Sequence, residues 1–120
     1  GKSVAALARF YQIAPENILV VHDELDMDPG IVRFKKAGGH GGHNGLRDTI
    51  KSLGNNKDFA RLRIGIGHPG QANLVADYVL KKASPNDQQL IANSIDDALR
   101  HLPTAVEGHW EKAMTALHSL

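Results

Sequence analysis

The segment from Gly38 to Asp48 constrains the fold of this chain more than any other. Five of its eleven residues are glycine and two are histidine. Glycine reaches backbone angles that are closed to other residues, and without a side chain its amide can approach a ligand closely. The segment runs into a predicted helix, whose N-terminal amides would favour anions and carbonyl oxygens. Because ordering so many glycines costs conformational entropy, we interpret the segment as a binding loop.

Apolar spacing in the first third of the chain predicts one helix and two strands. Apolar residues in segment 4–11 recur at helical intervals, and Pro15 ends that helix. The continuous apolar run at 18–21 is typical of a strand buried on both faces. A turn signature at 28–30 leads into the alternating segment 31–35, which we interpret as a half-exposed strand. We expect these two strands to form an antiparallel hairpin.

The middle of the chain is expected to hold two short helices and a third strand. The apolar residues of segment 46–53 mark one face of a helix, which the residues at 54–56 end. Asn44 would be the N-cap of this helix. Residues 62–66 alternate as a strand, and Asn73 is expected to cap a short helix after it.

Two longer helices are predicted at the end of the chain. Ser84 is an N-cap signal, with Pro85 in the first turn and Asp87 three residues after the cap. Pro103 is expected to break this helix. The residues expected to face inward are Ile91, Ile95, Ala98, Leu99 and Leu102 in the first helix, and Val106, Trp110, Ala113, Met114 and Leu117 in the second. Trp110 could stack on a nucleic-acid base, but its helical spacing favours core packing.

This order of elements indicates the α/β class. We expect a mixed sheet flanked by helices, in a single layered domain of the α/β/α type. The 120 residues suffice for one domain, and the low aromatic share of 5% implies a core of Val, Ile, Leu and Ala. Three strands make a thin sheet, so we expect further strands outside this chain.

Composition excludes several classes of function. The net charge is only +1, so any contact with nucleic acid must come from a local basic patch. There is no cysteine, which excludes a disulfide framework and thiol catalysis. No apolar run approaches the roughly 20 residues needed to cross a membrane. The basic residues that could form a patch are Lys35, Lys36, Arg47, Lys51, Arg61 and Arg63.

Three motifs resemble those of bacterial peptidyl-tRNA hydrolases, and they occur in the order found in that family. Segment 43–48, with Gly39 four residues ahead, resembles the family's second signature. Segment 21–26 and the turn after it resemble the family's strand that carries an aspartate. Segment 61–70 resembles its next strand. The resemblance covers nearly the whole chain and is strongest from 18 to 70.

The resemblance implies that the parent protein hydrolyses the ester between peptide and tRNA, which recycles tRNA after abortive translation. It implies a cytoplasmic monomer that needs no cofactor and no metal. The family's general-base histidine lies in a motif of the type Thr-Arg-His-Asn, which this sequence lacks. We therefore expect residues 1–120 to be the C-terminal portion of a single peptidyl-tRNA hydrolase domain. On this reading the base lies upstream and the chain alone is inactive.

Asp23 is the expected catalytic carboxylate. It ends an apolar strand, where open α/β sheets place ligand sites, and a carboxylate can hold an imidazole in one tautomer and stabilise its charged form. The resemblance gives Asp23 that role towards the absent histidine. The alternative is a solvated acid in a turn rich in carboxylates.

The resemblance also assigns substrate contacts. Asn44 matches an asparagine that contacts the tRNA substrate near the scissile ester, and its amide offers both a donor and an acceptor. His43 is expected to line the peptide side of the cleft, and the backbone amides of Gly41, Gly42, His43 and Asn44 to position the substrate near the ester carbonyl. These backbone contacts would not read the peptide's side chains.

Two further basic residues are expected to bind phosphates. The resemblance singles out Lys35 and Arg63 as phosphate contacts, which would add salt-sensitive affinity without sequence information. The alternative is that both are ordinary solvated side chains.

Several other functions stay open from the sequence. The chain could bind tRNA or peptides without turnover, or it could be a hydrolase that pairs Asp23 with His43. His40 and His43 have a spacing seen among metal ligands, but no third ligand lies at a useful spacing. The segment 65–70 matches the glycine pattern of dinucleotide-binding loops, but three features favour a plain loop: Pro69, the absence of a second parallel strand after it, and the absence of an acidic strand end about 20 residues on.

Overall fold

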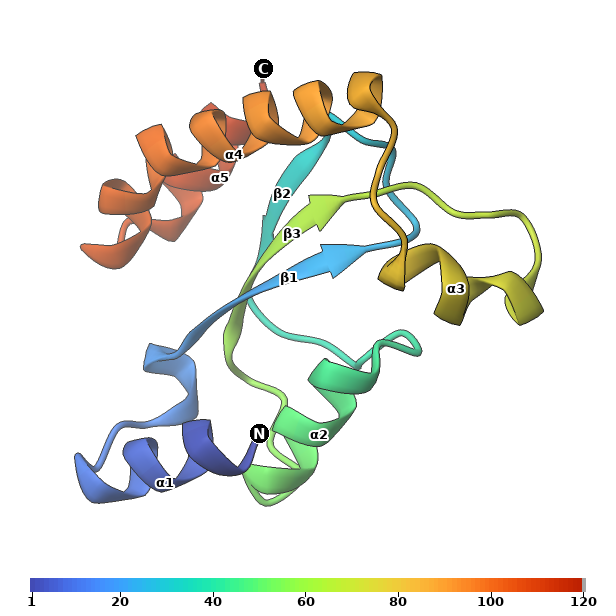
Figure 1. Ribbon diagram of the computed structural model, residues 1–120. Coiled ribbons are helices and arrows are strands. Elements are labelled where there is room, and N and C mark those ends of the chain that lie inside the picture. Colours follow the sequence, from blue (N-terminus) through green and yellow to red (C-terminus); the bar gives the residue numbers. More distant parts are fainter. Residues whose placement is uncertain (120) are drawn as a thin grey trace. The chain divides into compact units, whose positions relative to one another are not determined.

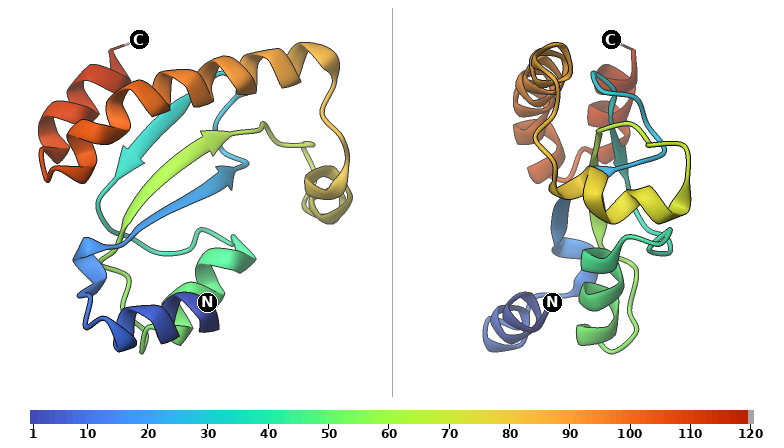
Figure 2. Two further views of the ribbon diagram at one scale, coloured as in Figure 1. Left: turned by 60° about the vertical axis from the view of Figure 1, so that its left-hand side comes forward. Right: turned by 45° about the vertical axis from the view of Figure 1, so that its right-hand side comes forward.

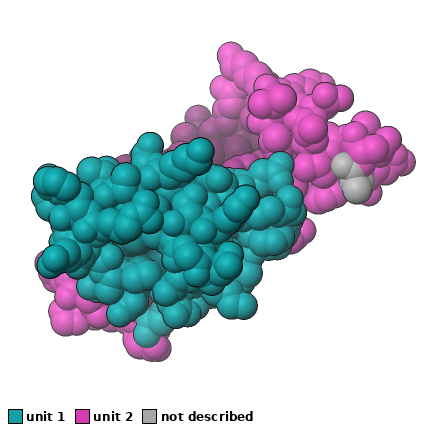
Figure 3. All heavy atoms as spheres, turned by 90° about the horizontal axis from the view of Figure 1, so that it is seen from below, with its two compact units in different colours: residues 1–21, 35–62 teal, residues 22–34, 63–120 magenta. Residues whose placement is uncertain are grey.

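The computed structural model describes residues 1–119 of the chain (Figures 1 and 2). These residues form two compact units, which Figure 3 shows in different colours. The first unit comprises residues 1–21 and 35–62, and the second comprises 22–34 and the chain from 63 onward. Each strand of the sheet contributes residues to both units, and the units are described separately below.

The sheet has three strands in the order β1-β3-β2. The strands are β1 (Leu19–Glu24), β2 (Val32–Lys35) and β3 (Ala60–Gly65). β1 and β3 run in the same direction and β2 runs opposite to them (Figure 2). The Ile66 amide donates to the Glu24 carbonyl at 3.0 Å, and the Gly65 amide donates to the Ile31 carbonyl at 2.9 Å. The predicted mixed sheet of an α/β fold is therefore confirmed.

The predicted hairpin between the first two strands is wrong, because β3 lies between them. The turn itself forms as expected: the Ile31 amide donates to the Asp28 carbonyl at 3.1 Å, and Gly30 has a φ of +98°. Gly65 of β3 then packs against this turn. A Cβ on Gly65 would lie 2.2 Å from the Asp28 carbonyl oxygen, so only glycine fits there. This contact between distant residues is not visible in the local pattern.

The first unit contains two packed α-helices. They are α1 (Lys2–Phe10) and α2 (Asn44–Ser52), and a short 3₁₀ helix η1 (Pro15–Asn17) leads into β1. The predicted end of α2 is confirmed, since Gly54 and Asn55 both have positive φ. The apolar spacing that predicted α1 does not mark its buried face, because Ala8 is buried but Leu7 is 59% exposed. The expectation that β1 is buried on both faces is also wrong, because Val21 is 55% exposed.

The second unit contains the remaining helices. They are η2 (Ala72–Leu74), α3 (Val75–Leu80), α4 (Pro85–Val106) and α5 (Trp110–His118). Ser84 caps α4 as predicted, and its Oγ accepts from the Asp87 amide at 3.2 Å. Asn73 lies inside η2, so the predicted cap of α3 is wrong. No described helix has the combination of length and apolar composition required to traverse a bilayer.

α4 continues through Pro103, which was expected to break it. Proline removes the amide that would bond to the carbonyl four residues earlier, here that of Leu99. Both Pro103 and Leu99 are exposed, so water can satisfy that carbonyl. The helix ends instead before Gly108, which has a φ of +92°.

The inward faces of α4 and α5, which pack on each other, are only partly those predicted. In α4 the buried residues are Ser94, Ala98 and Ala105, whereas Ile95 is 38% exposed. The buried positions of α4 thus hold small side chains, which hydrophobicity alone did not identify. In α5, Trp110 packs edge to face on Phe34 with ring centroids 5.9 Å apart, so its core role is confirmed.

Candidate functional site

The glycine loop, defined as residues 38–43, belongs to the first unit and is shaped by bonds within itself. Gly41 and Gly42 have φ values of +56° and +84°, in the left-handed region that favours glycine. The His43 amide donates to the His40 carbonyl at 2.9 Å, and the Gly42 amide donates to the His40 Nδ1 at 2.9 Å. These bonds, all within the loop, define its conformation.

The N-cap of α2 is His43, and the prediction that Asn44 is the cap is wrong. His43 Nδ1 accepts from the Leu46 amide at 3.1 Å. Asn44 is the first helical residue, its side chain is exposed, and its Oδ1 accepts from Arg47 Nη1 at 3.3 Å. Because the His43 imidazole accepts the capping hydrogen bond, the Asn44 side-chain amide is not used as a cap and lies at the surface.

The backbone amides expected to face a substrate carbonyl are only partly free. Those of Gly42 and His43 already donate to His40. Those of Gly41 and Asn44 have no partner within the described part of the chain, and both residues are exposed. Of the four amides predicted to face the substrate carbonyl, only those of Gly41 and Asn44 therefore remain available as donors.

Arg61 is a residue whose role the sequence did not reveal. It was grouped with the basic surface residues, but it is only 1% exposed. Its Nη1 donates to the Gly39 carbonyl at 3.0 Å, and its Nη2 donates to the carbonyls of Gly38 and Lys57. The guanidinium also lies over the Phe59 ring, 4.4 Å from its centroid. Arg61 therefore fixes the start of the glycine loop, and the carbonyls compensate its buried charge.

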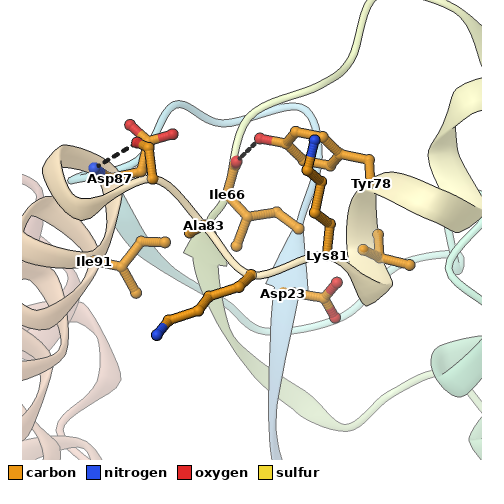
Figure 4. Close-up of a pocket in the computed structure, with 10 residues that line it drawn as sticks. Asp23, Ile66, Tyr78, Lys81, Ala83, Asp87 and Ile91 are labelled. Atoms are coloured by element: carbon orange, nitrogen blue, oxygen red, sulfur yellow. Dashed lines mark hydrogen bonds between the residues drawn. The ribbon is translucent and has the colours of Figure 1, made fainter.

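Asp23 lines a cavity of about 650 Å³ in the second unit (Figure 4). The carboxylate comes from β1, and the opposite wall is formed by α3, the start of α4 and the segment between them. The other lining residues are Ile66, Tyr78, Val79, Lys81, Lys82, Ala83, Ser84, Asp87 and Ile91. The cavity combines apolar walls with groups of both charges.

Two hydrogen bonds fix the surroundings of this cavity. The Tyr78 hydroxyl donates to the Ile66 carbonyl, which holds α3 at the end of β3 (Figure 4). On β1, His22 Nδ1 donates to the Asp23 carbonyl at 2.8 Å. His22 is buried while Asp23 is half-buried and lines the cavity, which fits the expected alternation of the strand.

The two predicted phosphate contacts lie in different surroundings. Lys35, in the first unit, is exposed. Its Nζ lies against Gly38, at 2.8 Å from the position that a Cβ on this glycine would take. Arg63, in the second unit, is half-buried, with its Nη2 3.5 Å from the Phe34 carbonyl oxygen.

A second arginine of this unit, Arg33, also belongs to a local basic cluster that the sequence did not single out. Burial first, and then the charges of Arg33 and Arg63, lower the pKa of His118. The three side chains are therefore close enough to interact electrostatically. Arg33 occupies the strand position between two buried apolar residues, Val32 and Phe34, and this alternation was the only signal in the sequence.

Neither alternative ligand site gains support from the geometry. Within residues 1–119, no three Asp, Glu or His side chains gather as a metal site would require. At 65–70 β3 ends and the chain continues as a loop as far as the one-turn helix η2, so the glycines do not open directly into a long helix as in a dinucleotide-binding loop.

Known proteins match this chain over nearly its whole length. A family model described as "Peptidyl-tRNA hydrolase" matches residues 1–120. The chain belongs to this family. The peptidyl-tRNA hydrolase of Teredinibacter turnerae is 61% identical and that of Vibrio parahaemolyticus 59% identical, each over 99% of this chain. A crystal structure of peptidyl-tRNA hydrolase from Acinetobacter baumannii superposes with a TM-score of 0.92 at 51% identity, covering 96% of this chain.

These relatives are longer than the chain. The match covers 61% of the peptidyl-tRNA hydrolase of Vibrio parahaemolyticus and 62% of that of Teredinibacter turnerae. It covers 58% of the Acinetobacter baumannii structure. The chain thus spans about three-fifths of the length of its curated relatives.

Proposed function

We propose that this chain forms the C-terminal part of a single-domain enzyme that hydrolyses the ester between a peptide and tRNA. The observation that carries the proposal is the Asp23 carboxylate in a cavity of about 650 Å³, in a chain whose relatives are named peptidyl-tRNA hydrolases. We further propose a cytoplasmic monomer whose partner is peptidyl-tRNA. The chemistry requires only water, a base and donors for the carbonyl oxygen.

In this mechanism an imidazole from outside residues 1–120 removes a proton from water. The oxygen of that water attacks the ester carbonyl and gives a tetrahedral oxyanion. The oxyanion collapses by expelling the ribose oxygen, which takes up the proton, so that the products are a free peptide and deacylated tRNA. Asp23 orients the imidazole and stabilises its charged form, as a buried carboxylate does in hydrolytic triads.

The glycine loop supplies the second set of proposed contacts. The free amides of Gly41 and Asn44 donate to substrate oxygen, and the Asn44 side chain contacts the tRNA end near the ester. Gly42 and His43 shape the loop on the peptide side. Donors of this kind can lower an acyl-transfer barrier by about 3 kcal/mol each when they meet the developing oxyanion.

His43 is a poor candidate for the general base itself. A neutral imidazole has one basic lone pair, and on His43 the Nδ1 lone pair accepts from the Leu46 amide. Abstraction of a proton by this nitrogen would first require loss of the α2 cap. This bond argues against His43 Nδ1 as the base in a hydrolase that pairs Asp23 with His43.

Binding of the tRNA backbone is assigned to Lys35 and Arg63. Lys35 is exposed, while the position of Arg63 beside Arg33 concentrates positive charge on a chain with a net charge of only +1. Such contacts would release counterions and make the affinity depend on salt.

The experiment is release of N-acetylated amino acid from tRNA by two proteins. One is residues 1–120, and the other is the same chain preceded by the segment that completes the relatives' length. We expect hydrolysis by the longer protein and none by the shorter one. Activity of residues 1–120 alone would contradict an external base, and folded proteins that both bind tRNA without turnover would favour a binding module instead.

A further inference from the structure

Phe34 lies on β2, an outer strand of the described sheet. Its backbone amide and its backbone carbonyl both contact side chains from outside that strand. Its amide donates to His118 Nε2 at 3.1 Å, a bond between residues 84 positions apart. Its carbonyl oxygen lies 3.5 Å from Arg63 Nη2. Amides on the outer side of an edge strand have no strand partner. At this position the imidazole supplies the acceptor.

Phe34 contacts both ends of α5. Trp110, the first residue of the helix, packs on the Phe34 ring, and His118, the last, accepts from the Phe34 amide. Phe34 is only 1% exposed, so this attachment is shielded from water. The position of α5 on β2 therefore depends on Phe34.

The attachment also borders the basic cluster. Arg63 Nε is buried and has no partner within residues 1–119, so this guanidinium is held only by its long contact to the Phe34 carbonyl. The charged groups that act on His118 from the neighbouring strands are Arg33 and Arg63. Together with burial they favour the neutral imidazole, which is the form that can accept from an amide.

We infer that His118 is a positioning residue for tRNA binding: as a neutral acceptor it fixes the Phe34 backbone, and through it the phosphate-binding arginine Arg63. This inference rests on the proposed function, in which Arg63 contacts a phosphate. A substitution that removes the acceptor frees the outer edge of β2 at Phe34. The Arg63 guanidinium then loses its defined position, although its charge is unchanged.

The test is the salt dependence of binding to deacylated tRNA, measured for His118→Leu, His118→Gln and Arg63→Ala. Each phosphate contact contributes about 0.9 to the slope of log affinity against log salt. We expect the slope to fall by about one for His118→Leu and for Arg63→Ala. His118→Gln, whose amide oxygen can still accept, should keep most of the slope. His109→Leu, at the exposed start of α5, is the matched control and should leave the slope unchanged.

The outcomes separate the inference from the function on which it rests. An unchanged slope in Arg63→Ala would refute the phosphate contact itself. A reduced slope in Arg63→Ala with an unchanged slope in folded His118→Leu, or with equal losses in the Leu and Gln variants, would refute only the role of His118.

Should His118→Leu fail to fold, the unmodified protein provides the test through hydrogen exchange of the Phe34 amide. Binding of tRNA should slow this exchange, because a phosphate that fixes Arg63 also fixes the Phe34 peptide. No change on binding would overturn the inference.

Discussion

Two glycine-rich segments of this chain look alike in sequence, and both contain glycines with left-handed backbone, but Gly65 in the second has a packing role that Gly41 and Gly42 lack. The glycine loop and segment 65–70 share one local device: Gly42 donates to His40 Nδ1 and Gly70 donates to His68 Nδ1, both at 2.9 Å. In the glycine loop, a Cβ on Gly41 or Gly42 would meet nothing within 4 Å. On Gly65, it would collide with the Asp28 carbonyl.

The difference teaches that glycine has two separate uses here. In the loop it permits left-handed backbone and leaves amides open to solvent, as a ligand-binding segment requires. At Gly65 it permits close packing of a strand on a turn. Composition alone cannot tell these uses apart, because the Asp28 carbonyl, which excludes a side chain at Gly65, is close in space but far away in sequence.

The largest effect on stability is expected at the residue that holds the loop. Arg61→Met removes the donors to three backbone carbonyls and should lower the free energy of unfolding by about 3 kcal/mol, measured by urea denaturation. Arg47→Met, at an exposed position of the loop's helix, should change it by no more than about 0.5 kcal/mol. Equal effects in the two variants would mean that Arg61 does not hold the loop.

The packing use of glycine is tested by Gly65→Ala. The added methyl group must displace the backbone of the turn at Asp28, which should cost about 2 kcal/mol of unfolding free energy. The same denaturation measurement checks it. A loss below about 0.5 kcal/mol would show that β3 does not approach the turn this closely.

The conformational use is tested by a pair of loop variants. Gly41→Ala places a side chain at a φ of +56° in open space, so strain alone should cost about 1 kcal/mol. Gly39→Ala meets no neighbour and needs no positive φ, so it should be neutral or stabilising by about 0.5 kcal/mol. If thermal melting ranks the two variants the other way, the loop conformation described above is incorrect.

The smallest effect is expected from acidification. Since the pKa of His118 is lowered in the folded protein, the unfolded chain binds the proton more readily. The free energy of unfolding should therefore decrease as pH falls below the ordinary histidine value of about 6.5, and level off below the folded pKa. His118→Gln should flatten this dependence in denaturation curves collected between pH 7 and 5. A wild-type curve that is already flat would contradict a neutral, half-buried imidazole at His118.

Local signals in the sequence predicted local structure well. The turn at 28–30, the end of α2 and the Ser84 cap each depend on residues within a few positions of one another, and all three formed as expected. The resemblance of three motifs also identified the family. The sequence did not predict contacts between distant residues. β3 lies between the first two strands, and the Arg61 side chain donates to carbonyls of the glycine loop.

The sequence also did not predict which of two neighbouring residues caps a helix or is buried. Both His43 and Asn44 could accept from the first turn of α2, and Asn is the commoner cap, yet the imidazole takes the bond. Similarly, on α4 Ser94 is 1% exposed while Ile95 is 38% exposed, the reverse of what hydrophobicity predicts. These choices depend on the surrounding fold, which spacing along the chain does not contain.

The central claim is that Asp23 orients a catalytic imidazole, and its most direct test is the kinetics of Asp23→Asn in a protein of the relatives' length that carries this chain. We expect kcat for release of N-acetylated amino acid from tRNA to fall about 10³-fold, with KM changed less than about threefold. Asp26→Asn, an exposed neighbour, should leave both constants unchanged. A rise in KM without loss of kcat would contradict the account and make Asp23 a binding residue.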